Sequence, residues 1–285
     1  MKKNPAANYM IIGSAKSATT SICRFLGTHP DIFMVKCKEP FFFSRQECHS
    51  KGIDWYESLY KGANGKKYRG EGSNDYTMKE VFPEALDRIY DYNPHLKLVY
   101  MVRHPISRIE SFWLEIRSHD REDVHYDFNR AIKERRDWFV DSCRYYSQIL
   151  PFIERFGEAN VYIGFFEDYV HDKYVELDKI VNFIGASPHS WDPTVKETKN
   201  SSESKRITRD VLSIARKVQW LRKSAQIIPF GLKAKITKQF LLKPVKKRPK
   251  WNETTRKWVE AEIREDCNKL LSYCGKPNSY WNWEI

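Results

Sequence analysis

The stretch GSAKSATTS, which begins at Gly13 and ends at Ser21, has the side chains and spacing needed to hold phosphate groups. A lysine supplies positive charge, and serine and threonine hydroxyls donate hydrogen bonds to phosphate oxygens. In a Walker A loop the lysine follows the second glycine, whereas here Lys16 comes earlier and Thr19 holds the Walker lysine's place. The stretch indicates a phosphate cradle of another kind, and an ordinary turn rich in Ser and Thr is the alternative.

A second anion-binding pattern lies in the segment YMVRHPISRIESFW, residues 100–113. Arg103 ends an apolar run, and Ser111 follows where a helix would bring it toward the same ligand group. The planar guanidinium of arginine suits phosphate. A kinase or GTPase would need an acidic residue at the end of this run to hold Mg²⁺. The arginine therefore favours a second phosphate group on a ligand that is bound without metal.

Both patterns follow apolar runs of strand length and precede runs with helical spacing. The alternation predicts an α/β fold, with a P-loop-like central parallel β-sheet flanked by helices on both faces. The predicted strands are Tyr9–Ile12, Leu96–Val102 and Asn160–Phe166, and the predicted helices are Thr19–Leu26, Ile106–Ile116, Tyr145–Phe156, Tyr174–Ile184, Val211–Leu221 and Asn252–Gly275.

The composition fits one domain spanning residues 1–285, with a less regular basic C-terminal cap around residues 190–250. A hydrophobic content of 41% supports a core, and the sequence contains no long apolar run that predicts membrane insertion and no signal peptide. We therefore expect a cytoplasmic protein. The formal charge of +12 favours anionic partners.

Neither a metal nor a nucleic acid is an expected partner. The cysteines form no CxxC pair, and their spacing with His49 fits no common zinc site, so we expect reduced thiols and no metal. The lysine-rich stretch KPVKKRPK, residues 243–250, lacks the interleaved aromatic residues on which bases stack.

In these motifs the sequence resembles the PAPS-dependent sulfotransferases, especially their bacterial and heparan-sulfate-type branch. PAPS is 3′-phosphoadenosine 5′-phosphosulfate. Residues 16–20, KSATT, resemble the family loop that binds the 5′-phosphosulfate, and Arg103 with Pro105 and Ser111 resembles the element that binds the 3′-phosphate. Residues 38–43, KEPFFF, and 71–76, EGSNDY, resemble further elements of that branch, and the likeness extends to about residue 187.

The resemblance implies an enzyme of the EC 2.8.2 type, a sulfotransferase of natural product or carbohydrate modification. It would move a sulfuryl group from PAPS, without metal, to a hydroxyl, or less readily an amine, of a small hydroxylated metabolite or sugar. The implied catalytic residues are Lys16, which stabilises the leaving oxygen, and Glu39, which takes the acceptor proton. The implied PAPS-binding residues are Lys16, Ser17, Ala18, Thr19, Thr20, Ser21, Arg103 and Ser111, and the implied acceptor-binding residues are Glu39, Phe41, Glu71 and Tyr76.

The sequence departs from the family pattern at two positions. Ala18 replaces a glycine, which is tolerable if its φ angle is negative, and Gly72 stands where some glycan-modifying members carry a lysine, which argues against a strongly anionic glycan acceptor. His104 is the alternative base. The alternative functions are a P-loop nucleotide kinase and a non-catalytic module that binds anions or nucleic acid.

Overall fold

The computed structural model describes residues 5–36, 39–119, 123–195, 206–208, 242–244 and 248–284. Its main sheet has five parallel strands in the order β2-β3-β1-β4-β5. The strands are β1 (Tyr9–Gly13), β2 (Ile32–Met34), β3 (Tyr68–Gly72), β4 (Lys97–Val102) and β5 (Val161–Phe165), and an antiparallel pair is formed by β6 (Arg206–Thr208) and β7 (Leu242–Pro244). This arrangement confirms the predicted α/β fold with a central parallel sheet.

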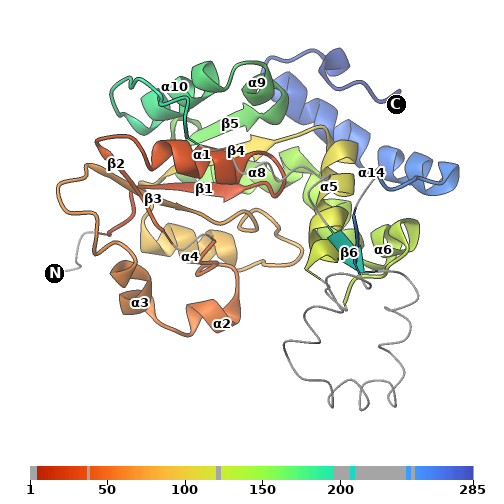
Figure 1. Cartoon of the computed structure of the whole chain (residues 1–285), viewed down its shortest axis with the longest axis horizontal. Coiled ribbons are helices and arrows are strands. Elements are labelled where there is room, and N and C mark those ends of the chain that lie inside the picture. The colour runs from red at the N-terminus through yellow and green to blue at the C-terminus, as the bar shows by residue number, and fades with distance from the viewer. Residues whose placement is uncertain are drawn as a thin grey trace.

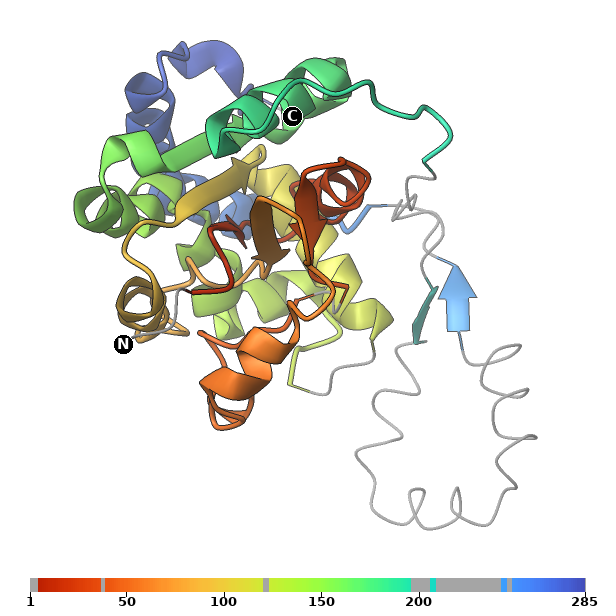
Figure 2. The ribbon, with the colours of Figure 1, turned by 90° about the vertical axis from the view of Figure 1, so that its left-hand side faces the viewer.

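Helices connect the strands and pack on both faces of the sheet (Figures 1 and 2). They are α1 (Thr19–Leu26), α2 (Gln46–His49), α3 (Ile53–Ser58), α4 (Ala85–Tyr92), α5 (Pro105–Ser118), α6 (Phe128–Glu134), α7 (Arg136–Phe139), α8 (Tyr145–Phe156), α9 (Phe166–His171), α10 (Lys173–Ile184) and α14 (Glu253–Tyr273), with short 3-10 turns η1 (Asp141–Cys143), η2 (Glu158–Asn160) and η5 (Asn278–Tyr280).

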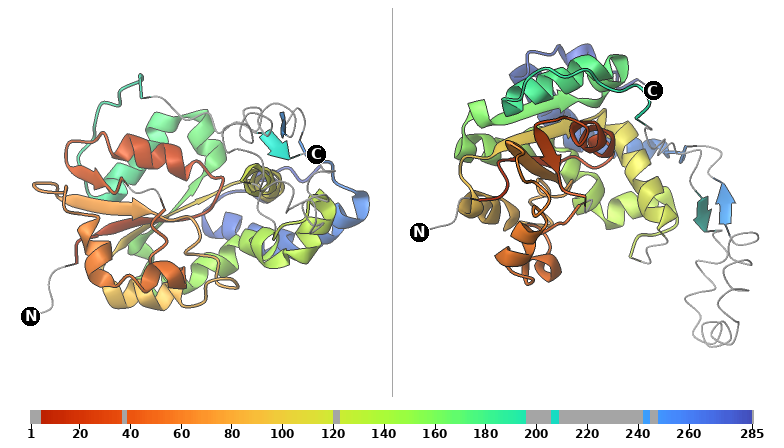
Figure 3. Two further views of the ribbon diagram at one scale, coloured as in Figure 1. Left: turned by 60° about the horizontal axis from the view of Figure 1, so that its bottom comes forward. Right: turned by 60° about the vertical axis from the view of Figure 1, so that its left-hand side comes forward.

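The two central strands, β1 and β4, are apolar apart from Lys97 at the start of β4, because both of their faces are covered. Successive side chains of a strand point to opposite faces, so Met10 and Leu98 join one buried cluster while Ile11 and Val99 join the other. Helices α1 and α10 cover the second face, and α4 and α8 lie on the first (Figure 3). This double cover explains why β1 and β4 lack the polar alternation of a sheet with one face in water.

The order of the strands places the functional loops together. From β1 the chain crosses to β2 and β3 on one side of the sheet, then returns to β4 and β5 on the other side. The turns that follow β1 and β4 therefore diverge at the carboxyl edge of the sheet, at the switch point where open α/β sheets bind ligands.

The strong sequence patterns are confirmed, and the weak ones were missed. Helix α1 begins at Thr19 and ends at Leu26 as predicted, whereas β2, β3 and several short helices between residues 46 and 92 were not predicted, since their apolar runs are too short. The predicted helix at residues 211–221 lies outside the described residues. Most of the basic cap also lies outside them, so the single-domain organisation stays a prediction.

The C-terminal helix α14 begins where the sequence indicates. The side chain of Asn252 accepts a hydrogen bond of 2.7 Å from the backbone N–H of Thr255, which is the expected N-cap contact. Among the described helices, none combines the length and apolarity that crossing a bilayer requires.

Candidate active site

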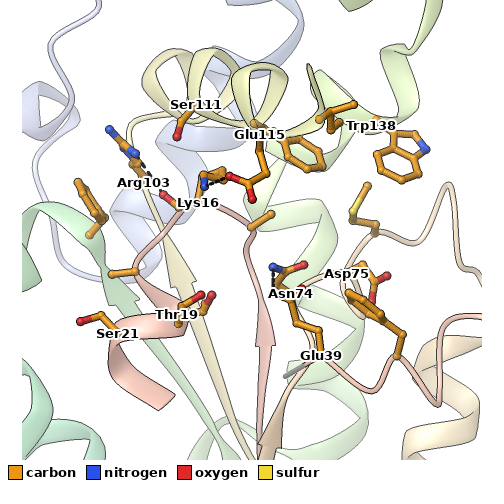
Figure 4. Close-up of a pocket in the computed structure, with 18 of the residues that line it drawn as sticks. Lys16, Thr19, Ser21, Glu39, Asn74, Asp75, Arg103, Ser111, Glu115 and Trp138 are labelled. Atoms are coloured by element: carbon orange, nitrogen blue, oxygen red, sulfur yellow. Dashed lines mark hydrogen bonds and ion pairs between the residues drawn. The ribbon is translucent and has the colours of Figure 1, made fainter. Parts of the chain in front are cut away.

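A pocket of about 640 Å³ opens at the carboxyl edge of the sheet, beside the switch point. Its size falls in the usual range for small-molecule sites. Figure 4 shows the turn after β1 and the start of α5 on one side of it, and residues that follow β2 and β3 on another. The lining includes Ala15, Lys16, Ala18, Thr19, Thr20, Ser21, Glu39, Phe41, Arg45, Asn74, Asp75, Met78, Arg103, Ser111, Phe112, Glu115, Ile116, His119, Trp138, Phe166, Tyr169 and Val170.

The loop after β1 is shaped by hydrogen bonds that point away from the pocket. The N–H of Ser14 donates to the carbonyl of Met101 at 2.7 Å, and the Ser14 hydroxyl donates to the same carbonyl at 2.9 Å. The hydroxyls of Ser14 and Ser17 lie 2.8 Å apart. These contacts bind the loop to the end of β4, so that the next residues curve around the cavity.

Left-handed backbone at alternate positions gives this loop its concave form. Lys16 has a φ angle of 71° and Ala18 one of 65°. Such alternation turns successive N–H groups toward one side, which makes a nest for anions. The condition under which alanine would be tolerated at position 18, a negative φ, is therefore not met, because this residue adopts the conformation that favours glycine.

Arg103 and Ser111 are brought to the same pocket as the loop. A guanidinium nitrogen of Arg103 donates to the carbonyl of Lys16 at 3.2 Å, and the Arg103 guanidinium carbon lies 4.2 Å from the centre of the Phe166 ring. Burial lowers the pKa of Arg103, while the negative charge of Glu167 acts in the opposite direction. Arginine remains charged at any physiological pH, so this end of the pocket presents a fixed cation beside Ser111.

The side chain of Lys16 meets a carboxylate inside the pocket. Its Nζ atom lies 2.8 Å from Glu115 Oε2, and both residues line the cavity. Glu115 follows Ser111 by one helical turn, so α5 presents the two to the same side (Figure 4). The ion pair places the Lys16 ammonium group between its own loop and helix α5.

Glu39 lines the other side of the pocket and is held by Asn74. The amide Nδ2 of Asn74 donates to Glu39 Oε1 at 2.7 Å (Figure 4). Glu39 and Phe41 have positive φ angles of 57° and 53°. The backbone N–H of Phe41 donates to the hydroxyl of Ser73 at 3.1 Å, which fastens this strained turn to the segment after β3.

Asp75 and Arg45 line the pocket on the same side as Glu39 and form an ion pair. Arg45 Nε donates to Asp75 at 3.2 Å, and its guanidinium lies 3.6 Å from the centre of the Phe41 ring. Ser44 also donates to Asp75, at 2.9 Å. Burial raises the pKa of Asp75 to about 6 although Arg45 opposes the shift. Aromatic rings and carboxylates thus share this part of the lining.

Glu71 and Tyr76, predicted to bind the acceptor, lie in the protein interior instead of on the pocket lining. Their exposed fractions are 0% and 1%, and the Tyr76 hydroxyl donates to Glu71 Oε1 at 2.6 Å. Ser73 donates to the other carboxyl oxygen at 2.8 Å. Burial raises the pKa of Glu71 to about 8. The Ser73 hydroxyl also accepts a hydrogen bond from the Phe41 N–H. Glu71 and Tyr76 therefore support the turn that carries Glu39 from the interior of the protein.

The structure places three further residues differently from the sequence expectations. The Ser17 side chain is fully buried and bonded to Ser14, so only its backbone can face a ligand. His104 is 7% exposed with Nε2 at 2.7 Å from the carbonyl of Asn282, and it is absent from the lining, so it is not placed as a base. A side chain at Gly72 would meet Cys23 Sγ at 2.6 Å, which explains the missing lysine by packing against α1.

Several lining residues were missed by sequence reasoning. Glu115 could have been found, since it lies one helical turn beyond Ser111 on the same face. Phe166 and Tyr169 could also have been found, because Phe166 ends the predicted third strand and Tyr169 comes three residues later. The Tyr169 hydroxyl lies 2.7 Å from the hydroxyl of Ser21. Asn74 lies in the stretch 71–76 that the resemblance singled out, but no role was predicted for it, and Trp138 carried no signal because it lies in the four-residue helix α7.

The residues 7–225 match the family model described as the sulfotransferase domain. That range covers most of the chain. The chain belongs to the sulfotransferase family. The match confirms the predicted PAPS-dependent sulfotransferase family and the predicted EC 2.8.2 type of enzyme.

Curated relatives are similar in sequence to parts of the chain. Human heparan sulfate glucosamine 3-O-sulfotransferase 6 is 33% identical over 99 residues, which are 35% of this chain and 27% of that protein. The mouse bifunctional heparan sulfate N-deacetylase/N-sulfotransferase 3 is 26% identical over 199 residues, or 64% of this chain and 22% of the relative. The matches thus span only about a quarter of these relatives' length.

Solved structures support the fold. The sulfotransferase from Alicyclobacillus acidocaldarius has a TM-score of 0.68 at 20% identity, with 96% of this chain and 98% of the other covered. Mouse sulfotransferase SULT7A1, solved in complex with PAP, has a TM-score of 0.50 at 13% identity, with 94% and 89% covered. PAP is the desulfated product of PAPS.

The donor set of the pocket fits a nucleotide with phosphate at both ends. Hydroxyls and left-handed backbone at residues 16–21 face one part of the cavity, while Arg103 and Ser111 face a neighbouring part. The described residues contain no cluster of three or more His, Cys, Asp or Glu side chains arranged to hold a metal ion.

Proposed function

We propose that this protein transfers the sulfuryl group of PAPS to a hydroxyl of a small hydroxylated metabolite or carbohydrate. The observation that carries the proposal is the meeting of Lys16 and the nest-forming loop with Arg103 and Ser111 in one pocket, with Glu39 on its other side. Separately, each pattern has an ordinary structural explanation. Together they supply anion binding and a base around one cavity.

On the donor side, the loop and the two anchors would hold the phosphate groups. The N–H groups and the Thr19 and Thr20 hydroxyls would bind the 5′-phosphate, and Arg103 with Ser111 would bind the 3′-phosphate. Lys16 would stabilise negative charge on the oxygen that bridges phosphorus and sulfur as the bond to sulfur breaks. The donor supplies the sulfuryl group and leaves as PAP.

On the acceptor side, Glu39 would remove the proton from the hydroxyl as its oxygen forms the bond to sulfur. Asn74 holds one carboxylate oxygen and so limits the rotation of the side chain. General-base assistance of this kind contributes about 10²–10⁴-fold to rate. Phe41, Phe112 and Trp138 offer flat apolar surfaces to the body of an acceptor.

The kinase alternative is disfavoured by the residue that follows β4. A nucleotide kinase holds Mg²⁺ with an acidic residue near its phosphate loop, whereas Arg103 occupies this position and reaches back to the loop. The alternative of a non-catalytic module that binds anions or nucleic acid gives no role to the hydrogen bond between Asn74 and Glu39.

Thermal unfolding with and without PAP tests the proposal. We expect millimolar PAP to raise the Tm of the wild type, since a ligand of the folded state stabilises it by mass action. Lys16→Ala and Arg103→Ala should lose most of that shift. No shift in the wild type, or an unchanged shift in both variants, would show that the pocket is not a PAPS site. Steeply salt-dependent nucleic-acid binding would instead favour the module.

A further inference from the structure

Arg108 is a buried arginine that stands behind the pocket rather than in it. It lies on α5 between Arg103 and Ser111, its exposed fraction is 1%, and it is absent from the pocket lining. The proposed function gives roles to Arg103 and Ser111 but none to Arg108. A buried guanidinium is costly unless its donors are satisfied, so its contacts indicate its purpose.

Arg108 binds the donor loop and a distant turn at once. Its Nε donates to the carbonyl of Ala15 at 3.0 Å, and its Nη1 donates to the hydroxyl of Ser142 at 2.9 Å. Nη1 also lies 3.0 Å from the thiol sulfur of Cys143. These partners are all neutral, and the rings of Phe112 and Tyr145 flank the guanidinium, with centres at 5.4 and 6.0 Å.

The contact with Ala15 falls where the loop most needs a restraint. The next residue, Lys16, has left-handed backbone, and so does Ala18. A non-glycine residue in that region costs about 1–2 kcal/mol, and such strain persists only where surrounding contacts over-determine the conformation. Arg108 holds the carbonyl of residue 15, and Arg103 holds that of residue 16.

The other end of the guanidinium reaches the acceptor side of the pocket. Ser142, which accepts from Arg108, donates its own hydrogen bond to the carbonyl of Trp138, a lining residue. Arg108 therefore links the Ala15 carbonyl of the donor loop, through Ser142, to helix α7, which carries Trp138. A lysine could keep the charge but not the planar fork of donors.

We propose that Arg108 is a positioning residue that fixes the donor loop by holding the Ala15 carbonyl, without touching the donor itself. This inference rests on the proposed PAPS-dependent function. It assigns to Arg108 the alignment of the loop N–H groups, and it leaves phosphate contact to Arg103.

The experiment compares Arg108→Lys with Arg117→Lys. Arg117 is also buried on α5, with an exposed fraction of 4%, and it is not among the lining residues, so it is a matched control. The PAP dissociation constant is measured by calorimetry, and amide hydrogen exchange is followed in a peptide covering residues 13–18. For Arg108→Lys we expect a dissociation constant raised at least tenfold, with faster exchange concentrated in that peptide. Arg117→Lys should do neither.

Ser142→Ala keeps the arginine and removes one of its partners, so it tests the link even where Arg108→Lys fails to fold. It should raise the PAP dissociation constant a few-fold and speed exchange in residues 13–18. Unchanged PAP affinity in Ser142→Ala, or equal exchange changes across the chain, would overturn the positioning role. Absence of PAP binding in the wild type would instead remove the proposed function itself.

Discussion

The two sides of the pocket are built in different ways. The donor side is a nearly continuous run of residues after β1, joined by Arg103, which follows β4, and by Ser111 on α5. The acceptor side is assembled from the loops after β2 and β3, with Trp138 from α7. Its contacts are polar and partly buried, with Asn74 on Glu39 and Ser73 between Phe41 and Glu71.

The two sides keep their shapes through different kinds of contact. The donor loop is restrained through its carbonyls, which are held by Arg103 and Arg108. The Glu39 turn is restrained through side chains, which depend on a carboxyl group buried beneath it. We expect substitutions on the two sides to separate donor binding from catalysis, and pH to act mainly on the acceptor side.

Glu39→Gln is expected to have the strongest effect and tests whether the acceptor side acts in catalysis without binding the donor. The amide keeps the size of the side chain but cannot take a proton, so kcat should fall by about 10²–10⁴-fold. PAP affinity should stay within about twofold of wild type, since the donor side is untouched. Sulfation of a model alcohol and PAP calorimetry would measure both quantities. A parallel loss of PAP binding would mean that Glu39 belongs to the donor side.

A smaller effect, of about a few kcal/mol, is expected for the pH dependence of stability through Glu71. Its folded pKa of about 8 lies above the ordinary value of 4.5, because burial disfavours the charge. Between these values the unfolded carboxyl releases its proton while the folded one keeps it. This contribution to stability is therefore complete below about pH 4.5 and is lost as pH rises to about 8.

Glu71→Gln removes this loss. Its amide oxygen can accept from one of the Tyr76 and Ser73 hydroxyls, and its NH2 group can donate to the other. The Tm of the variant relative to wild type should therefore increase steadily from about pH 5 to about pH 8.5. Thermal scans across that range give the comparison. Asp75, whose pKa is raised to about 6, provides a contribution of the same sign in both proteins. Parallel curves would show that the buried carboxyl does not titrate in this window.

Asn74→Ala is expected to lower kcat about tenfold, since a hydrogen bond to a charged group is worth about 1.5–3 kcal/mol. The loss follows from freeing the Glu39 carboxylate, which Asn74 otherwise holds at 2.7 Å. Asn160→Ala is a control, because its amide bonds only the carbonyl of Phe156 among its described contacts, away from the pocket. Equal activities of the two variants would rule out an orienting role for Asn74.

The smallest effect is expected for Ala18→Gly on the donor side. Glycine relieves the left-handed strain at this position, and the gain of up to about 1 kcal/mol is reduced by the greater entropy of the unfolded chain. A denaturant melt should show equal or higher stability than wild type. Ala15→Gly, at a position without positive φ, should instead lose about 0.5–1 kcal/mol. Destabilisation by Ala18→Gly would mean that the methyl group packs productively.

The sequence alone predicted strands β1, β4 and β5 of the central sheet, helix α1 and the donor side of the pocket. Long apolar runs and helical spacing are local patterns, and the loop after β1 is one contiguous segment, so Lys16, Thr19 and Arg103 could be identified from spacing. The resemblance carried by those motifs also identified Glu39 as a candidate base.

The acceptor side, and the contacts that support both sides from the interior, became visible only in the folded structure. Asn74 reaches Glu39 across 35 residues of sequence, and Arg108 reaches Ala15 across 93, so no local spacing predicts either contact. Burial decided the rest. Glu71, Tyr76 and Ser17 have the chemistry of site residues, but packing turns their side chains inward. Ala18 adopts a left-handed conformation because the loop contacts, not its own preference, set its backbone.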